Sequence, residues 1–133
     1  MPLHAVLITL LTVFLLGIAM SVVSRARGQH RVAAPAVTGP PAFERAFRAH
    51  QNLLEQTLMF LPTLWVASLY GNPAWAAWAG YAWLFGRAWY QVAYVREGGK
   101  RGTPFTLAIL AWLALWVIAL VGVWPALASA MAG

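Results

Sequence analysis

The sequence contains no cysteine among its 133 residues. Without cysteine the chain forms no disulfide framework, has no thiolate nucleophile of its own and lacks a cysteine metal site. Any thiol chemistry must therefore use a thiol that a substrate brings. His50 is interpreted as a polar neighbour rather than a metal ligand, because His4 and His30 are poorly placed to join it. We expect no metal site.

Charge is also scarce, since charged residues make up 9% of the chain and hydrophobic residues 62%. Soluble domains carry about 25% charged residues, and a soluble fold with room for one domain cannot hide this much apolar surface. Lipid can solvate it instead. The net charge of +6 does not indicate a nucleic-acid partner, because the charges bracket hydrophobic segments. We therefore expect an integral membrane protein.

Long apolar segments are the main feature of the sequence. The first, Leu3 to Val23, has about twenty residues, enough for a hydrocarbon core of roughly 30 Å. It lacks the basic start of a signal peptide, so we interpret it as a retained span. Proline- and glycine-marked turns separate the later segments. The sequence predicts an all-α membrane protein, a bundle of four transmembrane helices in one domain over 1–133, with helices at about 3–24, 42–70, 74–96 and 104–127.

The positive charges are distributed unevenly. Every Lys and Arg falls between Arg25 and Arg101, mostly around the first and third connections. This bias predicts that both connections lie in the cytoplasm and both termini outside. Arg25 and Arg31 are interpreted as topology signals. The alanine- and tryptophan-rich composition, without an ER retention signal, favours a bacterial inner membrane.

The sharpest pattern is a polar stripe at the start of the second segment. Four polar residues recur there at spacings of three, four and three, namely Arg45, Arg48, Asn52 and Glu55. Such spacing places all four on one face of a helix that descends into the membrane. A carboxylate inside a membrane costs several kcal/mol unless it is paired. Glu55 therefore needs a partner.

A second stripe follows in the third segment. Arg87, Tyr90 and Tyr94 stand at i, i+3 and i+7, so a guanidinium and two phenols share one face near the same end of the bundle. Arg96 and Arg101 lie just beyond. Several fixed cations beside one intramembrane carboxylate favour a pocket for a ligand with several carboxylates and at least one ammonium group.

The same residues also fit a purely structural interpretation, which their spacing leaves open. Buried charges must be paired whatever the function of the protein. A buried ion-pair network would then tie the helices together through Arg48, Asn52, Glu55 and Arg87. The two tyrosines, taken alone, are typical of the aromatic belt at a membrane interface.

Both stripes are embedded in longer motifs. Thr38-Gly-Pro-Pro41 precedes Phe43-Glu-Arg-x-x-Arg-Ala-x-x-Asn-x-x-Glu55, Phe60-Leu-x-x-Leu-Trp-Val-Ala67 follows, and Leu84-Phe-Gly-Arg-x-x-Tyr-x-x-x-Tyr-x-Arg96 leads to Arg101 and Pro104. Together they resemble the MAPEG family, the membrane-associated proteins of eicosanoid and glutathione metabolism, and within it the branch of microsomal glutathione transferases and leukotriene-forming enzymes. The resemblance covers roughly residues 24 to 107. The rest of the chain matches only in hydrophobicity.

The resemblance implies a homotrimer of four-helix subunits that holds glutathione between neighbouring subunits near the cytoplasmic face. The implied contacts with this co-substrate are Arg27, from the subunit interface, with Arg48, Asn52, Glu55, Tyr90 and Tyr94. Arg101 matches the arginine that activates the glutathione thiol. The implied function is that of a glutathione transferase, which conjugates the glutathione thiolate to a lipophilic electrophile drawn from the lipid bilayer. Detoxification is the implied role, and peroxidase activity is an implied side activity.

Two positions depart from the leukotriene-forming members of the family. Gln56 stands where they have a tyrosine, and Gly28 stands where they have a second adjacent arginine. Glutamine still forms hydrogen bonds, so glutathione binding is not threatened. The missing arginine concerns the acceptor, and leukotriene synthesis is therefore not inferred.

Two alternative functions remain at this point. A non-enzymatic, lipid-binding scaffold of the same family is disfavoured because Arg101 and the whole stripe are present. A small multidrug exporter also has four helices with one membrane carboxylate. Its glutamate lies in the first helix, however, where this chain has no acid.

Overall fold

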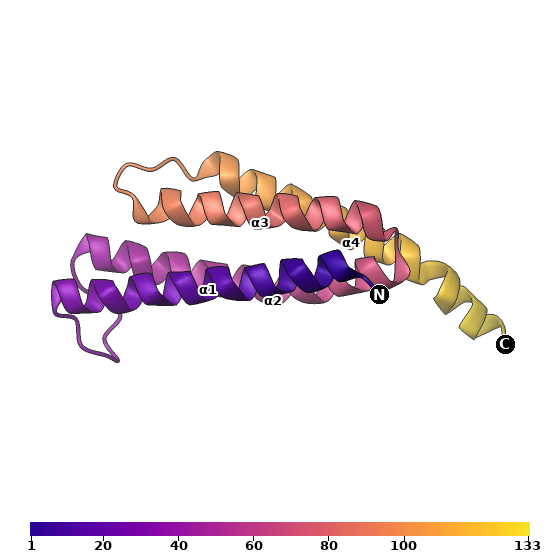
Figure 1. The fold of residues 1–133 in the computed structure, drawn as a ribbon, viewed down its shortest axis with the longest axis horizontal. Helices are drawn as coiled ribbons and strands as arrows, with labels where there is room; N and C mark the ends of the chain where they lie inside the picture. Colours follow the sequence, from indigo (N-terminus) through magenta and orange to yellow (C-terminus); the bar gives the residue numbers. More distant parts are fainter.

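The computed structural model describes all 133 residues and contains four α-helices. In chain order they are α1 (Leu3–His30), α2 (Pro41–Tyr70), α3 (Pro73–Val95) and α4 (Gly102–Ala132). The connections 31–40 and 96–101 lie at one end of the bundle (Figure 1). The N-terminus and the α2–α3 turn lie at the other end, where α4 extends beyond the rest (Figure 1). The all-α class with four helices confirms that part of the prediction.

Prolines and one capping residue set the starts of the middle helices. Pro41 and Pro73 open α2 and α3, at positions where a missing N–H costs no hydrogen bond. The Asn72 Oδ1 atom accepts hydrogen bonds from the backbone N–H groups of Ala74, at 3.0 Å, and Trp75, at 3.1 Å. The uncharged α2–α3 turn is thereby fixed by a side-chain cap.

Two helices are longer than the sequence prediction. α1 does not end at residue 24 but continues to His30, and Arg31 ends it in the left-handed conformation, with φ at 54°. No proline interrupts this basic segment, and arginine is a good helix former. α4 likewise runs from residue 102 to Ala132 rather than from 104 to 127, with Pro125 inside it. The alanines of its tail favour the helix.

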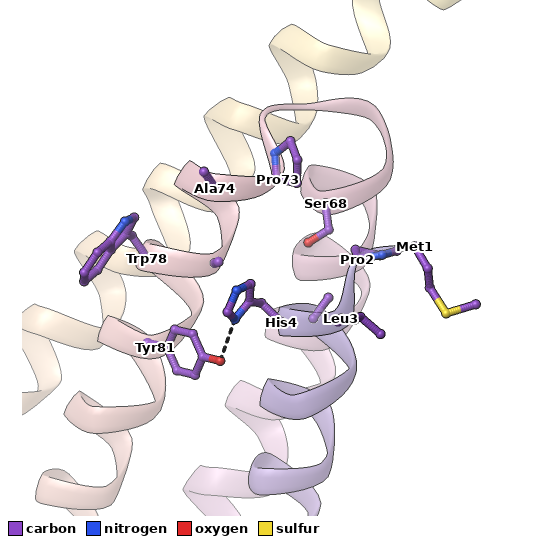
Figure 2. Close-up of a pocket in the computed structure, with 11 residues that line it drawn as sticks. Met1, Pro2, Leu3, His4, Ser68, Pro73, Ala74, Trp78 and Tyr81 are labelled. Atoms are coloured by element: carbon purple, nitrogen blue, oxygen red, sulfur yellow. Dashed lines mark hydrogen bonds between the residues drawn. The ribbon is translucent and has the colours of Figure 1, made fainter.

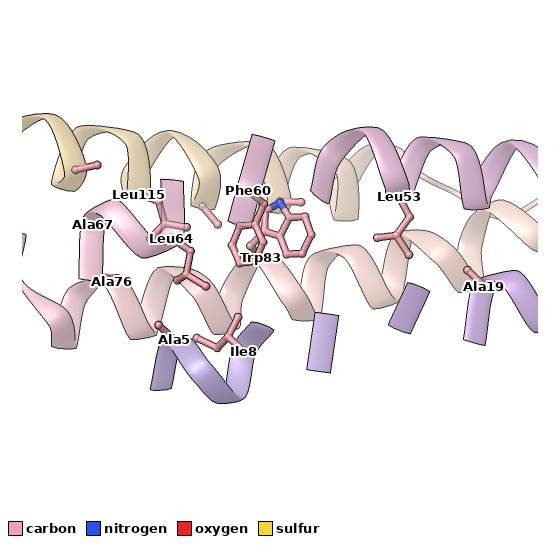
Figure 3. Packing of buried hydrophobic residues seen from close by; sticks show 13 residues of the cluster. Ala5, Ile8, Ala19, Leu53, Phe60, Leu64, Ala67, Ala76, Trp83 and Leu115 are labelled. Atoms are coloured by element: carbon pink, nitrogen blue, oxygen red, sulfur yellow. The ribbon is translucent and has the colours of Figure 1, made fainter. Parts of the chain in front are cut away.

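The core combines one aromatic pair with many small residues. Phe60 of α2 and Trp83 of α3 stack with ring centroids 3.6 Å apart and planes 3° apart (Figure 3). A Cβ atom added at Gly80 would lie 2.7 Å from Cδ1 of Ile8, so glycine lets α1 approach α3 closely. Seven of the 13 residues of this core cluster are alanines, namely Ala5, Ala19, Ala67, Ala76, Ala108, Ala111 and Ala119. Small residues of this kind are typical of packed helices in membranes.

The outer surface of the bundle is apolar. α1 and α4 are long and apolar enough to cross a membrane, yet 22% of the residues in the most apolar stretch of each are buried. A core helix of a soluble protein would be mostly buried. Large side chains of α4, among them Trp116, Val121 and Trp124, are exposed. An apolar exterior of this extent favours lipid as the solvent of the bundle.

Candidate functional site

The connections 31–40 and 96–101 lie at one end of the bundle (Figure 1). There, residues of α2, α3 and both connections line a hollow of about 650 Å³. We call it the charged hollow. It gathers six of the seven side chains that the sequence analysis assigns to a ligand site, namely Arg48, Asn52, Glu55, Tyr90, Tyr94 and Arg101. Residues far apart in the sequence therefore meet in one place.

The α2 wall of the charged hollow follows from helix periodicity. Arg48, Asn52 and Glu55 all line it, because residues three or four apart share a helix face. Arg48 and Glu55 are exposed, and Asn52 is half-buried. A single chain by itself therefore forms no buried ion-pair network through these residues, since Arg48 and Glu55 are both exposed.

Arg87 lies behind the charged hollow and is only 1% exposed. Its Nη2 donates a hydrogen bond to Asn52 Oδ1 at 2.6 Å, and its guanidinium carbon lies 4.3 Å from the centroid of the Tyr90 ring. Because Oδ1 of Asn52 is engaged by Arg87, the Nδ2 group of Asn52 remains as a donor for a ligand. A buried cation thus orients one wall of the site.

Arg101 and Tyr94 form the opposite wall. The guanidinium carbon of Arg101 lies 4.1 Å from the centroid of the Tyr94 ring, a cation–π contact that restrains an otherwise exposed side chain. Tyr90 packs against Tyr94 with ring centroids 5.6 Å apart. Arg101 is also the N-cap of α4, so the positive end of the helix dipole lies at the same place. This wall is suited to a negative group.

Arg27 does not line the charged hollow. Its Nη1 donates hydrogen bonds to the backbone carbonyls of Ala36, at 2.7 Å, and Val32, at 3.4 Å. Its guanidinium carbon also lies 5.0 Å from the centroid of the Phe43 ring. Within one protomer Arg27 therefore holds the connection 31–40 against α2.

Three lining residues were not predicted, namely Val37, Phe47 and Gln51. Gln51 follows Arg48 by three residues and precedes Glu55 by four, so the helical spacing contained its signal. Val37 comes from the connection, where no periodic pattern exists. Of the two departures noted above, Gln56 is half-buried outside the charged hollow, and Gly28 is exposed.

A second large hollow, of about 590 Å³, lies at the other end of the bundle between α1 and α3 (Figure 2). We call it the apolar hollow, because most of its lining is hydrophobic. One hydrogen bond in its lining joins two side chains, between His4 Nδ1 and the Tyr81 hydroxyl at 3.0 Å (Figure 2). No arginine, lysine or carboxylate side chain lines it.

Known proteins resemble this chain over most of its length. The MAPEG family model matches residues 5–121. Microsomal glutathione S-transferase 2 of Mus musculus is 44% identical over 101 residues, which cover 76% of this chain and 69% of that protein. Leukotriene C4 synthase of Cavia porcellus is 43% identical, covering 80% of this chain and 75% of that protein. An uncharacterized protein of Synechocystis sp. is 40% identical, covering 88% and 85%. The chain belongs to the MAPEG family, and it is an integral membrane protein.

Proposed function

We propose that this protein is a membrane-embedded glutathione transferase, which joins the thiolate of glutathione to a lipophilic electrophile and reduces peroxides as a side activity. The observation that carries the proposal is that one hollow holds Arg48, Asn52, Glu55 and Arg101 beside two phenols. Two relatives named for glutathione transfer and leukotriene C4 synthesis support it.

The polar groups of the charged hollow match glutathione in kind. Glutathione carries two carboxylates, one ammonium group, two amides and one thiol. Arg48 is suited to a carboxylate, which a guanidinium binds through paired hydrogen bonds. Glu55 is the one carboxylate in the lining and suits the ammonium group. Asn52 and the two tyrosines then supply hydrogen bonds to the amides.

Arg101 is the proposed catalytic residue. At about 4 Å and an effective dielectric of about 20, a guanidinium attracts a thiolate by roughly 4 kcal/mol. Desolvation consumes part of this gain, and the helix N-terminus at Arg101 adds to it. Each unit by which the thiol pKa falls gives about tenfold more thiolate at neutral pH. Arginine suits this role because it stays protonated.

The reaction then proceeds without a cysteine from the protein. The glutathione thiol releases its proton to water, and its sulfur attacks the electrophilic carbon of the acceptor. A carbon–sulfur bond forms while the leaving group, or the oxygen of an opened epoxide, takes the displaced electron pair. Holding both reactants in one site supplies the remaining acceleration.

We further infer a homotrimer in which all four helices of each subunit cross the membrane. In one protomer Arg48 and Glu55 are exposed, although a carboxylate at this depth calls for an enclosing partner. A neighbouring subunit would cover this side, and its Arg27 would complete the glutathione contacts. The site would then lie near the cytoplasmic face, in a bacterial inner membrane.

Mixing the purified protein with glutathione tests the proposal. We expect the ultraviolet absorbance of a bound thiolate at neutral pH, and turnover when a chlorodinitrobenzene acceptor is added. A lipid-binding scaffold would take up lipid without forming thiolate, and that outcome would refute the enzymatic function.

A further inference from the structure

A further hollow, of about 480 Å³, opens beside the charged hollow, between the start of α2 and the connection 96–101. We call it the arginine hollow. Four arginines line it, namely Arg45, Arg48, Arg96 and Arg101. Glu44 is the only carboxylate in the lining, so four cations against one anion leave three positive charges uncompensated. A surplus of this kind in a concave surface favours a multivalent anion.

Two of the guanidinium groups are held in place by the fold. Arg45 Nε donates a hydrogen bond to the carbonyl of Val95 at 3.2 Å, which anchors the side chain and leaves its terminal nitrogens available. Arg101 lies over the ring of Tyr94 at 4.1 Å, which occupies the face of the guanidinium but not its N–H edge. Both arginines are therefore preorganised donors.

The connection 96–101 forms the other wall of the arginine hollow and lies close to the end of α3. Gly99 N–H donates to the carbonyl of Arg96 at 3.1 Å, and Gly98 has a positive φ of 72°, which favours glycine. A Cβ atom at Gly99 would lie 2.0 Å from the carbonyl oxygen of Ala93. Two glycines thus let the connection fold back onto the end of α3, with an arginine on each side.

We propose that the arginine hollow binds a phosphate-bearing anion, supplied by the headgroup of an anionic phospholipid or by free phosphate. A carboxylate offers two oxygens and is satisfied by one or two guanidinium groups, whereas a phosphate monoester, as in phosphatidic acid, or free phosphate offers three or four oxygens to several arginines at once. The hollow lies at the helix ends, and basic pockets between helices at a membrane surface bind acidic headgroups.

The arginine hollow also shares a wall with the charged hollow. Arg48 and Arg101 line both, whereas Arg45 and Arg96 line the arginine hollow alone. A bound phosphate group therefore competes for two guanidinium groups that glutathione would use. This competition rests on the proposed function, but binding of the phosphate group does not.

Native mass spectrometry of the full-length protein tests the site. The wild type is mixed with equal amounts of phosphatidic acid and phosphatidylcholine, beside a double variant, Arg45→Gln with Arg96→Gln. The matched control, Arg25→Gln with Arg31→Gln, removes the same charge from two exposed arginines outside the hollow. We expect the first variant to retain at least about 100-fold less phosphatidic acid, because two arginines that form charge-assisted hydrogen bonds with the phosphate group are lost, and the control to match the wild type.

Two results would contradict the proposed phosphate site. Equal losses in both double variants would mean a diffuse effect of net charge, and no loss in either would mean that the hollow is not occupied. Thermal unfolding checks that each variant is folded. Arg96→Gln alone keeps the contact between Arg45 and Val95, and it should still lower retention at least about tenfold.

Calorimetry with inorganic phosphate distinguishes the two sources. Phosphate binding that weakens in the first variant but not in the control supports free phosphate as a ligand. Lipid retention without phosphate binding supports the headgroup, and equal phosphate and lipid binding by all three proteins counts against the site. Glutathione binding to the wild type in phosphatidylcholine is measured separately, so a failure there rejects the proposed function and leaves the lipid result standing.

Discussion

The two ends of the bundle hold hollows of similar size and opposite chemistry. The charged hollow has a volume of about 650 Å³ and is lined by two arginines, a glutamate and two tyrosines. The apolar hollow has a volume of about 590 Å³, and one hydrogen bond between side chains of its lining joins His4 and Tyr81. Helix packing therefore creates space at both ends, but it does not decide what the space can bind.

The difference lies in where charged side chains enter the helices. Between Phe60 and Gly86, which includes the half of α2 and of α3 around their common turn, there is no charged residue. In the other half, Arg48 and Arg87 lie about two turns inside the ends of α2 and α3, and Glu55 lies at the middle of α2. Charges at such depths are costly unless they are paired, and they are typical of functional sites. A few positions at one end thus give an otherwise uniform apolar bundle its chemistry.

Dissociating the proposed trimer should have the largest effect. The end with the charged hollow would then bind glutathione no better than the apolar end. Native mass spectrometry from mild detergent should detect a trimer that binds glutathione. Dissociation to monomers should abolish binding, since one protomer leaves Arg48 and Glu55 exposed. A stable monomer that still binds glutathione would contradict the trimeric site.

Replacing the proposed catalytic arginine should have the next largest effect. In Arg101→Ala the pKa of bound glutathione should rise by about one or two units, and turnover should fall roughly 10- to 100-fold. Thiolate absorbance against pH and steady-state kinetics measure both. Lys100→Ala, at the adjacent exposed position, is the control. An unchanged thiol pKa with normal turnover would remove Arg101 from the mechanism.

Removing the single acid of the charged hollow should weaken binding rather than chemistry. Glu55→Gln keeps the shape but loses the charge that pairs with the ligand ammonium group, and a hydrogen bond to a charged group is worth about 1.5–3 kcal/mol. Calorimetry should detect an affinity at least about tenfold lower, in an intact trimer. Glu44→Gln, outside the charged hollow, should bind normally. Failed assembly with normal binding in the remainder would favour a structural role.

Removing the hydrogen bond that orients the Asn52 amide should lower the glutathione affinity by a smaller factor. Arg87→Met removes the 2.6 Å hydrogen bond that orients Asn52 and replaces a buried cation with an apolar side chain, which removes the cost of burying a charge. We expect normal thermal stability and glutathione affinity about fivefold lower, equivalent to about 1 kcal/mol. The same affinity in Arg87→Met and in the wild type would mean that Arg87 does not orient the site.

The smallest effect should come from the apolar end. Tyr81→Phe removes the hydroxyl that contacts His4, and the loss of one partly exposed hydrogen bond should cost at most about 1 kcal/mol of unfolding free energy. Glutathione turnover should not change. A loss of turnover comparable to that of Arg101→Ala would show that the two ends do not differ in function as proposed.

The sequence was sufficient for features that depend on neighbouring residues. Helix class and number follow from apolar segment length, and the common wall of Arg48, Asn52 and Glu55 follows from helical periodicity. The meeting of this stripe with Tyr90 and Tyr94 in one hollow was also expected and is present. The roles of these residues in glutathione binding stay predictions.

Features that depend on contacts between helices were not available from the sequence. The spacing placed Arg87 beside the two tyrosines, but not behind Asn52 and almost completely buried. Arg27 was expected at a ligand, and within one protomer it binds backbone carbonyls of the connection 31–40. The continuation of α1 to His30 differs from the prediction, because basic residues after an apolar segment indicate the edge of the membrane and not the end of the helix.

The length of α4 has a consequence for the surrounding bilayer. A Cβ atom at Gly122 would lie 2.4 Å from the carbonyl oxygen of Tyr70, so α4 passes the α2–α3 turn there and residues 123–132 continue beyond it (Figure 1). Its 31 residues contain no charge and measure about 46 Å, against about 30 Å of hydrocarbon. A helix with such hydrophobic mismatch tilts or thickens the lipid around it. α4 therefore makes the orientation of the whole bundle depend on membrane thickness, and it favours thicker membranes over thinner ones.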